Sequence, residues 1–139
     1  MNQFDLKNRT AIITGGAQGF GFDIAKRFLK SGAKVIIWDI DKNELLKASK
    51  ELNSHNLSYN IVDVSSYDQV QSTSSEIIKK SNIDILINNA GITGSTASVW
   101  EYDEEEWYKI ININLMGTFN CCKSIVPIMI KNNKDRIVN

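Results

Sequence analysis

The 139-residue chain contains little of several residue types, and each shortage excludes a class of explanation. It has one proline, one histidine and two cysteines, and sixteen basic residues balance sixteen acidic ones. Nucleic-acid-binding proteins usually carry a surplus of positive charge, so we expect no nucleic-acid partner. The basic residues are scattered along the sequence, which also argues against a basic membrane-binding patch.

Long apolar runs are missing as well. No run approaches the roughly 18–20 residues of a membrane-spanning helix, and residues 1–9 lack the apolar core of a signal peptide, so we expect a cytoplasmic protein with no membrane partner. The cysteines are neighbours, Cys121 and Cys122, and no third thiol is present to pair with either. We expect them to be small buried apolar residues. His55 has no cysteines or acids at ligand spacing, so we expect it on the surface and expect no metal site.

Short apolar runs alternate with helical patterns, which predicts β-α-β units and a parallel sheet. The expected strands are 10–14, 34–39, 57–63 and 83–88, with a fifth begun by 136–139. The expected helices are 19–31, 41–54, 66–81 and a long one at 103–132, in which Pro127 is expected either to cause a kink or to shorten the run of hydrogen bonds. Right-handed crossovers favour the strand order 3-2-1-4-5. The predicted fold class is therefore α/β, a Rossmann-type doubly wound parallel sheet whose later strands are missing.

A glycine-rich loop joins the first expected strand to the first expected helix. It reads Thr14-Gly15-Gly16-Ala17-Gln18-Gly19-Phe20-Gly21. A dinucleotide pyrophosphate must approach backbone N–H groups at a helix N-terminus, and glycine permits both that approach and the positive φ of the turn. The spacing of Gly15, Gly19 and Gly21 is G-x-x-x-G-x-G, which differs from the general G-x-G-x-x-G fingerprint. The alternative is a glycine-rich turn with no ligand.

An acidic residue, Asp39, ends the second expected strand, eighteen residues after Gly21. An acid at that place accepts hydrogen bonds from the adenosine ribose hydroxyls and repels a 2′-phosphate. Neither Ile40, which follows it, nor Gln18 in the glycine loop supplies a cation for that phosphate. The pattern therefore favours NAD over NADP, and the alternative is an ordinary solvated aspartate.

Two later motifs complete a family resemblance. Asn88-Asn89-Ala90-Gly91 follows the fourth expected strand, and Asn114-Leu115-Met116-Gly117 lies in the long helix. With the glycine loop and its preceding threonine, they resemble the classical branch of the short-chain dehydrogenase/reductase family. Phe20 departs from the family pattern, where a smaller aliphatic residue is usual. The resemblance covers residues 4–139, about the first half of a typical member, and is closest to the 3-oxoacyl-carrier-protein reductase-like group and to sugar or polyol dehydrogenases.

The resemblance implies roles for particular residues. Asp63 and Val64 would border the adenine, although Asp63 could also cap the next helix. Asn88 would tie neighbouring strands together. Asn114 would be the catalytic asparagine, whose carbonyl holds a proton-relay water; Asn112 is its nearby competitor, but the spacing to Gly117 favours Asn114. The implied cofactor-binding set is Thr14, Gly15, Gln18, Gly19, Phe20, Gly21, Asp39, Asp63, Val64, Asn89, Ala90 and Gly91.

The resemblance also implies an activity and its missing parts. The parent would be an NAD-dependent oxidoreductase that transfers hydride between the cofactor and a small carbonyl or secondary-alcohol substrate, and it would form homo-oligomers through the helix at 103–132. The family's serine and Tyr-x-x-x-Lys motif are absent, because no lysine stands four residues after Tyr59, Tyr67, Tyr102 or Tyr108. We therefore expect residues 1–139 to be an incomplete NAD-binding domain that ends within its fifth strand and is inactive by itself. The alternative is a non-catalytic nucleotide-binding or partner-binding module.

Overall fold

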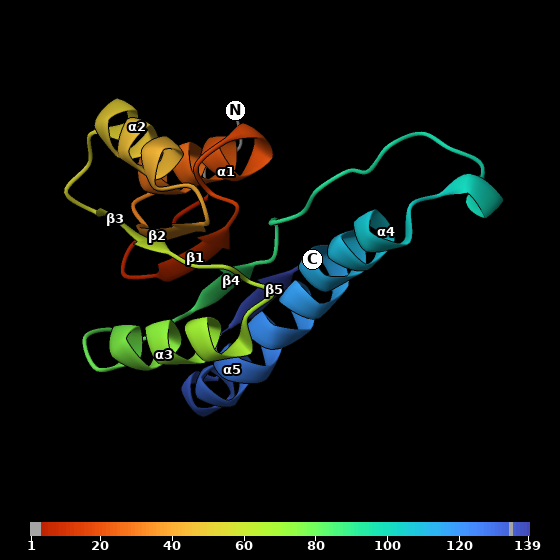
Figure 1. Cartoon of the computed structure of the whole chain (residues 1–139). Helices are drawn as coiled ribbons and strands as arrows, with labels where there is room; N and C mark the ends of the chain where they lie inside the picture. Colours follow the sequence, from red (N-terminus) through yellow and green to blue (C-terminus); the bar gives the residue numbers. More distant parts are fainter. Residues whose placement is uncertain (1–3, 134) are drawn as a thin grey trace.

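The computed structural model describes residues 4–133 and 135–139 as a sheet covered by helices on both faces (Figure 1). Five parallel strands lie in the order β3-β2-β1-β4-β5, which confirms the predicted Rossmann-type arrangement. The strands are β1 Thr10–Thr14, β2 Lys34–Asp39, β3 Leu57–Ile61, β4 Ile85–Ile87 and β5 Arg136–Val138. The helices are α1 Gly19–Lys30, α2 Lys42–Leu52, α3 Tyr67–Ile78, α4 Glu104–Ile111 and α5 Gly117–Asn132, with a short 3-10 turn η1 at Val99–Glu101.

Two apolar clusters hold the layers together, one on each face of the sheet. Helices α1 and α2 cover one face and α3 and α5 cover the other (Figure 1). Successive residues of a strand point to opposite faces, so Ala11 and Ile13 join the first cluster while Ile12 joins the second. The interior residues of β2 are buried on both sides, as its continuous apolar sequence predicts. Every residue of β1 is buried, so the loop that follows it starts from a fixed point.

Polar side chains set the starts of three helices. Asp41 caps α2, because its carboxylate accepts hydrogen bonds from the backbone N–H groups of Asn43 (2.8 Å) and Glu44 (3.1 Å). Ser66 caps α3, and Asp103 caps α4 by accepting from Glu106 N (2.7 Å). Each cap satisfies N–H groups that have no partner within the helix.

The long helix predicted for 103–132 is present as one continuous helical stretch, Glu104–Asn132. It contains one wider π-helical turn, η2, at Asn112–Met116, between α4 and α5. This irregular turn lies at η2 and not at Pro127, which remains inside α5. Helix α4 buries none of its residues, whereas α5 buries Gly117, Asn120, Cys121, Ile125 and Met129 against the second cluster. Turns of this kind are often found at functional sites.

Helix α4 projects away from the sheet (Figure 1). Trp38 in β2 is fully buried, whereas Trp107 in α4 is 50% exposed and makes an edge contact with Tyr102, at 5.8 Å between ring centroids. Within the described residues, the continuous helical stretch Glu104–Asn132 is long and apolar enough to span a membrane by length and composition alone, which the sequence reading did not anticipate. That is weak evidence for a span, because interior helices meet the same criteria.

The cysteines behave in part as expected. Cys121 is buried, and burial raises the pKa of its thiol to about 12. Cys122 is half-buried, with its sulfur 3.4 Å from Nδ2 of Asn88. His55 lies on the surface as predicted.

Candidate functional site

A pocket of about 550 Å³ opens where β1, β2 and β4 end. The strand order reverses between β1 and β4, and ligands of open α/β sheets bind at that crevice. Ten of the predicted site residues line the pocket: Gly15, Gln18, Gly19, Phe20, Asp39, Asp63, Val64, Asn89, Ala90 and Gly91. Thr14, Gly21 and Asn114 lie outside the lining, and each holds part of it in position.

Thr14 joins the two loops on either side of the crevice. Its side chain is buried, and its hydroxyl donates to the carbonyl oxygen of Ile87 (3.3 Å). The hydroxyl oxygen of Thr14 also accepts hydrogen bonds from the backbone N–H groups of Asn89 and Ala90, at 3.0 Å each. In return, Nδ2 of Asn89 donates to the carbonyl oxygens of Thr14 (3.0 Å) and Gly15 (3.1 Å). Seven donor and acceptor groups are thus satisfied between the ends of β1 and β4.

The glycine loop leaves the start of α1 open. Gln18 occupies the N-cap position without a side-chain cap, and the first turn of α1 contains no acidic residue. Gly19 has φ +53°, and a Cβ there would meet no atom within 4 Å. N–H groups at a helix N-terminus that donate to no side chain attract an anionic group.

Gly21 is required for a different reason. A Cβ at this position would lie 2.2 Å from the carbonyl oxygen of Gly15 and 2.6 Å from Nδ2 of Asn89. The first turn of α1 therefore packs directly on the loop beneath it. Gly21 allows α1 to pack closely on the glycine loop, while Gly19 adds no side chain to the outer surface of that loop.

Asp39 is anchored at the pocket edge by backbone donors. Its Oδ2 accepts from the N–H of Ala17 (3.3 Å), and its Oδ1 accepts from the N–H of Asp41 (3.2 Å). The charged residues that line the pocket are Asp39, Asp41 and Asp63, and among the described residues no Lys, Arg or His joins them. An additional phosphate at this end of the pocket would meet negative charge without a lining cation.

Asp63 and Val64 form the opposite wall. Asp63 accepts from both the N–H (2.9 Å) and the hydroxyl (2.6 Å) of Ser65, so its carboxylate closes the turn after β3, while the N-cap of α3 is Ser66. Val64 is fixed from α5, where Nδ2 of the buried Asn120 donates to its carbonyl oxygen (2.9 Å). Asn120 was missed by the sequence reading, although a lone amide in an apolar helical run was an available signal.

Asn114 lies in the π-helical turn and holds the loop after β4. Its Oδ1 accepts from the N–H of Ile92 and its Nδ2 donates to the carbonyl oxygen of the same residue, both at 2.9 Å. The hydroxyl of Thr118 donates to the backbone carbonyl of Asn114 (2.9 Å). Its competitor Asn112 is exposed, as Asn114 is, but it lines a different hollow with Ile40 and Asp63. The geometry favours Asn114 over Asn112 as the residue beside the loop, and its catalytic role stays a prediction.

Asn88 ties β4 to the neighbouring strand, as expected. Its backbone N–H donates to the carbonyl oxygen of Val138 (2.9 Å), and its Nδ2 donates to Oδ1 of Asn139 (2.7 Å). Over residues 4–133 and 135–139, no group of three His, Cys, Asp or Glu side chains is placed to hold a metal ion.

The pocket also has lining residues that the sequence reading did not assign: Ile40, Asp41, Val62, Ile92 and Ile113. Three of them adjoin assigned residues in the sequence and Asp41 lies two residues after Asp39, so proximity to Asp39, Asp63 and Gly91 was an available signal. Ile113 comes from η2, and its place depends on where that helix crosses the sheet.

The chain belongs to the short-chain dehydrogenase family, since a family model described as "short chain dehydrogenase" matches residues 9–139. It is 40% identical over 138 residues to a 3-oxoacyl-[acyl-carrier-protein] reductase FabG of Chlamydia trachomatis, covering 96% of this chain and 55% of the relative. It is 37% identical over 132 residues to the 2-dehydro-3-deoxy-L-rhamnonate dehydrogenase (NAD(+)) of a Sphingomonas species, covering 94% and 52%.

Solved structures agree with this assignment. The chain superposes with a TM-score of 0.91 on the crystal structure of gox2181 (33% identity) and on NAD+-bound xylitol dehydrogenase (28% identity). Each superposition covers 96% of this chain and 53% of the other. The chain spans about half the length of the curated relatives it matches.

The two pocket glycines give a testable contrast. We expect Gly21→Ala to lower the free energy of unfolding by about 3 kcal/mol, because the added methyl group overlaps a backbone carbonyl that cannot move away freely. We expect Gly19→Ala to cost only about 1 kcal/mol, from the left-handed backbone conformation alone. Urea unfolding followed by circular dichroism measures both values, and equal losses would contradict the packing described for Gly21.

Proposed function

We propose that this chain binds NAD in the pocket at the ends of β1, β2 and β4. It would serve as the nucleotide-binding part of an oxidoreductase that transfers hydride between nicotinamide and a carbonyl or secondary alcohol. The observation that carries the proposal is that an uncapped helix N-terminus and an anchored carboxylate, Asp39, line the same pocket at a sheet reversal. The names of an NAD(+)-dependent relative and an NAD+-bound structural neighbour support it.

The pocket residues fit the parts of a dinucleotide. The N–H groups at the start of α1 would hold the pyrophosphate, since no side chain caps them. Asp39 would accept hydrogen bonds from the adenosine ribose, while Asp63 and Val64 would border the adenine. The loop from Asn89 to Gly91 would line the second ribose. When bound, the nicotinamide ring would accept or supply the hydride, and the protein would orient it.

Preference for NAD over NADP follows from the charges at the ribose end. A 2′-phosphate would add negative charge beside Asp39 and Asp41, with no lining cation among the described residues to compensate. Asp39 would therefore favour NAD twice, by bonding the free ribose hydroxyls and by repelling the phosphate.

Replacing this carboxylate tests the proposal. For Asp39→Ala we expect weaker NAD+ binding and a fall of about tenfold or more in the ratio of the NADP+ to the NAD+ dissociation constant, since hydrogen bonds to charged groups contribute about 1.5–3 kcal/mol. Isothermal titration calorimetry of each nucleotide measures the ratio. Asp68→Ala, on the exposed start of α3, is the control. Equal NAD+ and NADP+ affinities in the unmutated chain would contradict the proposal.

Proton transfer is proposed to require residues that this chain does not contain. The sequence holds no Tyr-x-x-x-Lys motif, and positioned acid–base groups contribute about 10²- to 10⁴-fold to rate. Asn114 would assist by holding a relay water at its backbone carbonyl, which now accepts from Thr118.

We therefore expect the purified 139-residue chain to bind NAD+ without oxidising secondary alcohols or polyols. NADH absorbance, followed with the chain in large amounts, measures this directly. NADH formation that scales with the concentration of the chain would show that the described residues already contain a proton acceptor.

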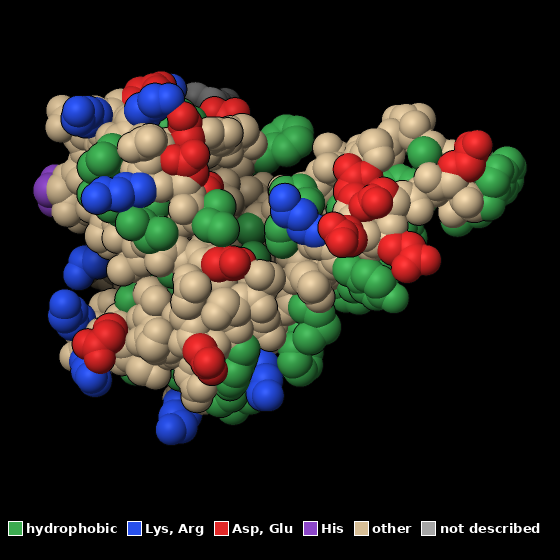
Figure 2. Space-filling model, viewed as in Figure 1, with side chains coloured by type: hydrophobic (Ala, Val, Ile, Leu, Met, Phe, Trp, Pro, Cys, Tyr) green, Lys and Arg blue, Asp and Glu red, His purple; other side chains and the backbone are tan. Residues whose placement is uncertain are grey.

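We also propose self-association through the rod formed by α4, η2 and α5. Apolar side chains are exposed along this rod (Figure 2). They are Trp107, Tyr108, Leu115, Met116, Phe119 and Ile130, between 40% and 72% exposed. Monomers rarely expose contiguous apolar patches larger than a few hundred Å². The same surface favours the second candidate function, a partner-binding module.

Light scattering coupled to size-exclusion chromatography tests the association. We expect a mass above that of one chain, and a shift towards monomer in Leu115→Glu combined with Phe119→Glu, because two charges would then lie on the apolar surface. Leu46→Glu, at a partly exposed position on α2, is the control. A monomeric unmutated chain with a cooperative thermal transition would contradict the proposal.

A further inference from the structure

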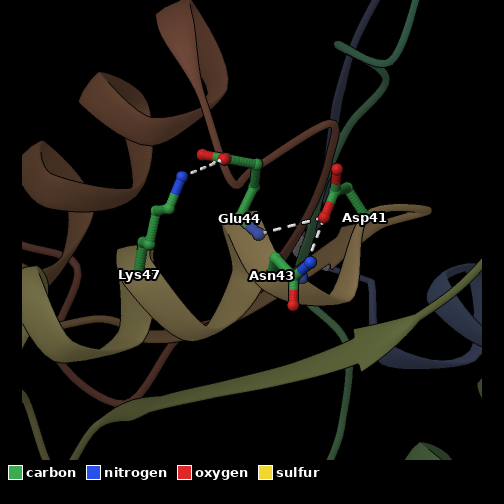
Figure 3. A network of polar contacts seen from close by, with 4 residues as sticks. All are labelled: Asp41, Asn43, Glu44 and Lys47. Atoms are coloured by element: carbon green, nitrogen blue, oxygen red, sulfur yellow. Dashed lines mark hydrogen bonds and ion pairs between the residues drawn. The ribbon is translucent and has the colours of Figure 1, made fainter.

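The ribose end of the pocket is linked to α2 by a polar chain centred on Glu44. Asp41, which lines the pocket, accepts a hydrogen bond from the backbone N–H of Glu44 (3.1 Å), and the side chain of Gln18, also in the lining, lowers the pKa of the Glu44 carboxyl. The Glu44 carboxylate also pairs with the ammonium group of Lys47 one turn further along α2 (Figure 3). The ion pair therefore lies on the first turn and a half of α2, whose start is fixed by the pocket-lining Asp41.

The burial and protonation of the pair show which partner is restrained. The Glu44 side chain is 25% exposed, whereas the Lys47 side chain is 71% exposed and would be free to move without its partner. The Lys47 ammonium lowers the pKa of Glu44, with a smaller contribution from Gln18, and Glu44 raises the pKa of Lys47. Both groups thus stay charged throughout the neutral range.

A lysine without an ion-pair partner near the ribose end would change phosphate binding, because the pocket lining is negatively charged. The lining offers three aspartates and, among the described residues, no cation. Lysine binds phosphate as a flexible point charge, so an unpaired Lys47 could partly offset the repulsion that a 2′-phosphate meets at Asp39. In the ion pair, the charge of Lys47 is neutralised and its ammonium is turned to Glu44.

We propose that Glu44 is a second determinant of cofactor choice, which holds Gln18 in place at the ribose end and withholds Lys47 from a 2′-phosphate. The inference rests on the proposed function, because it requires an adenine dinucleotide in this pocket. Glu44 is a positioning residue, since it acts through Gln18 and Lys47.

Glu44→Gln separates the two contacts. The backbone N–H of residue 44 still donates to the Asp41 cap, and glutamine is as acceptable as glutamate at the third position of a helix. The new amide can still bond Gln18, but it has no charge to pair with Lys47. Glu76→Gln is a matched control, because Glu76 and Lys79 form the same i,i+3 ion pair on α3, outside the pocket lining.

The experiment compares 5′-AMP with adenosine 2′,5′-bisphosphate, which differ only by the 2′-phosphate, by calorimetric titration of the 139-residue chain. We expect Glu44→Gln to raise the affinity for the bisphosphate by about three- to tenfold and to leave that for 5′-AMP within about twofold. The gain should shrink as salt rises from about 0.05 to 0.5 M. It should disappear in the double variant Glu44→Gln/Lys47→Ala.

Each outcome bears on a separate claim. An unchanged ratio in Glu44→Gln, with 5′-AMP still bound, overturns this inference and leaves the proposed function standing. A gain that persists in the double variant overturns the role of Lys47, since loss of negative charge alone would explain it. Failure of the unmutated chain to bind 5′-AMP, NAD+ and NADP+ overturns the proposed function and this inference with it.

Discussion

The site depends on the junction between the ends of β1 and β4 that is made by Thr14 and Asn89. The Thr14 hydroxyl donates once and accepts twice, which uses its full hydrogen-bonding capacity. Both loops leave the sheet at its reversal point, where β1 leads to α1 on one face and β4 leads towards α5 on the other. The junction extends the pairing of β1 with β4 into these loops and so holds the glycine loop beside the loop at Asn89. The pocket is therefore a property of the sheet as well as of its glycines.

The remaining walls are held by the same kind of contact, from a side chain to a backbone group of a neighbouring loop. Asp39 accepts from Ala17, Asn120 donates to Val64, and Asn114 bonds Ile92 in both directions. Asn120 is a buried amide, for which an unpaired group would be costly, so its contact fixes Val64 strongly. Some residues line the pocket and others hold the lining loops in position. Thr14, Gly21 and Asn114 belong to the second group, which explains why they lie outside the lining although the family resemblance places them at the site.

Local sequence predicted the parts of the fold that local rules control. The bounds of β1 and β2 were correct, because both strands are buried runs ended by polar or glycine residues. The third strand was predicted to reach residue 63 but stops at Ile61, which is 50% exposed on an edge strand with a single neighbour. The π-helical turn, Ile113 and Asn120 could not be placed, since each depends on how the long helix crosses the sheet. The exposure of Trp107 has the same origin, because periodicity does not show that α4 leaves the sheet.

The central claim is that the pocket at the sheet reversal receives the nucleotide, and amide chemical-shift mapping during an NAD+ titration tests it most directly. The account predicts saturable shifts in the loops at Gly15–Gly21, Asp39–Asp41, Asp63–Val64 and Asn89–Ile92. It predicts no comparable shifts around the hollow at the other end of α1, which is lined by Phe4, Lys7 and Arg27. Shifts centred on that second hollow, or spread evenly over the chain, would contradict it.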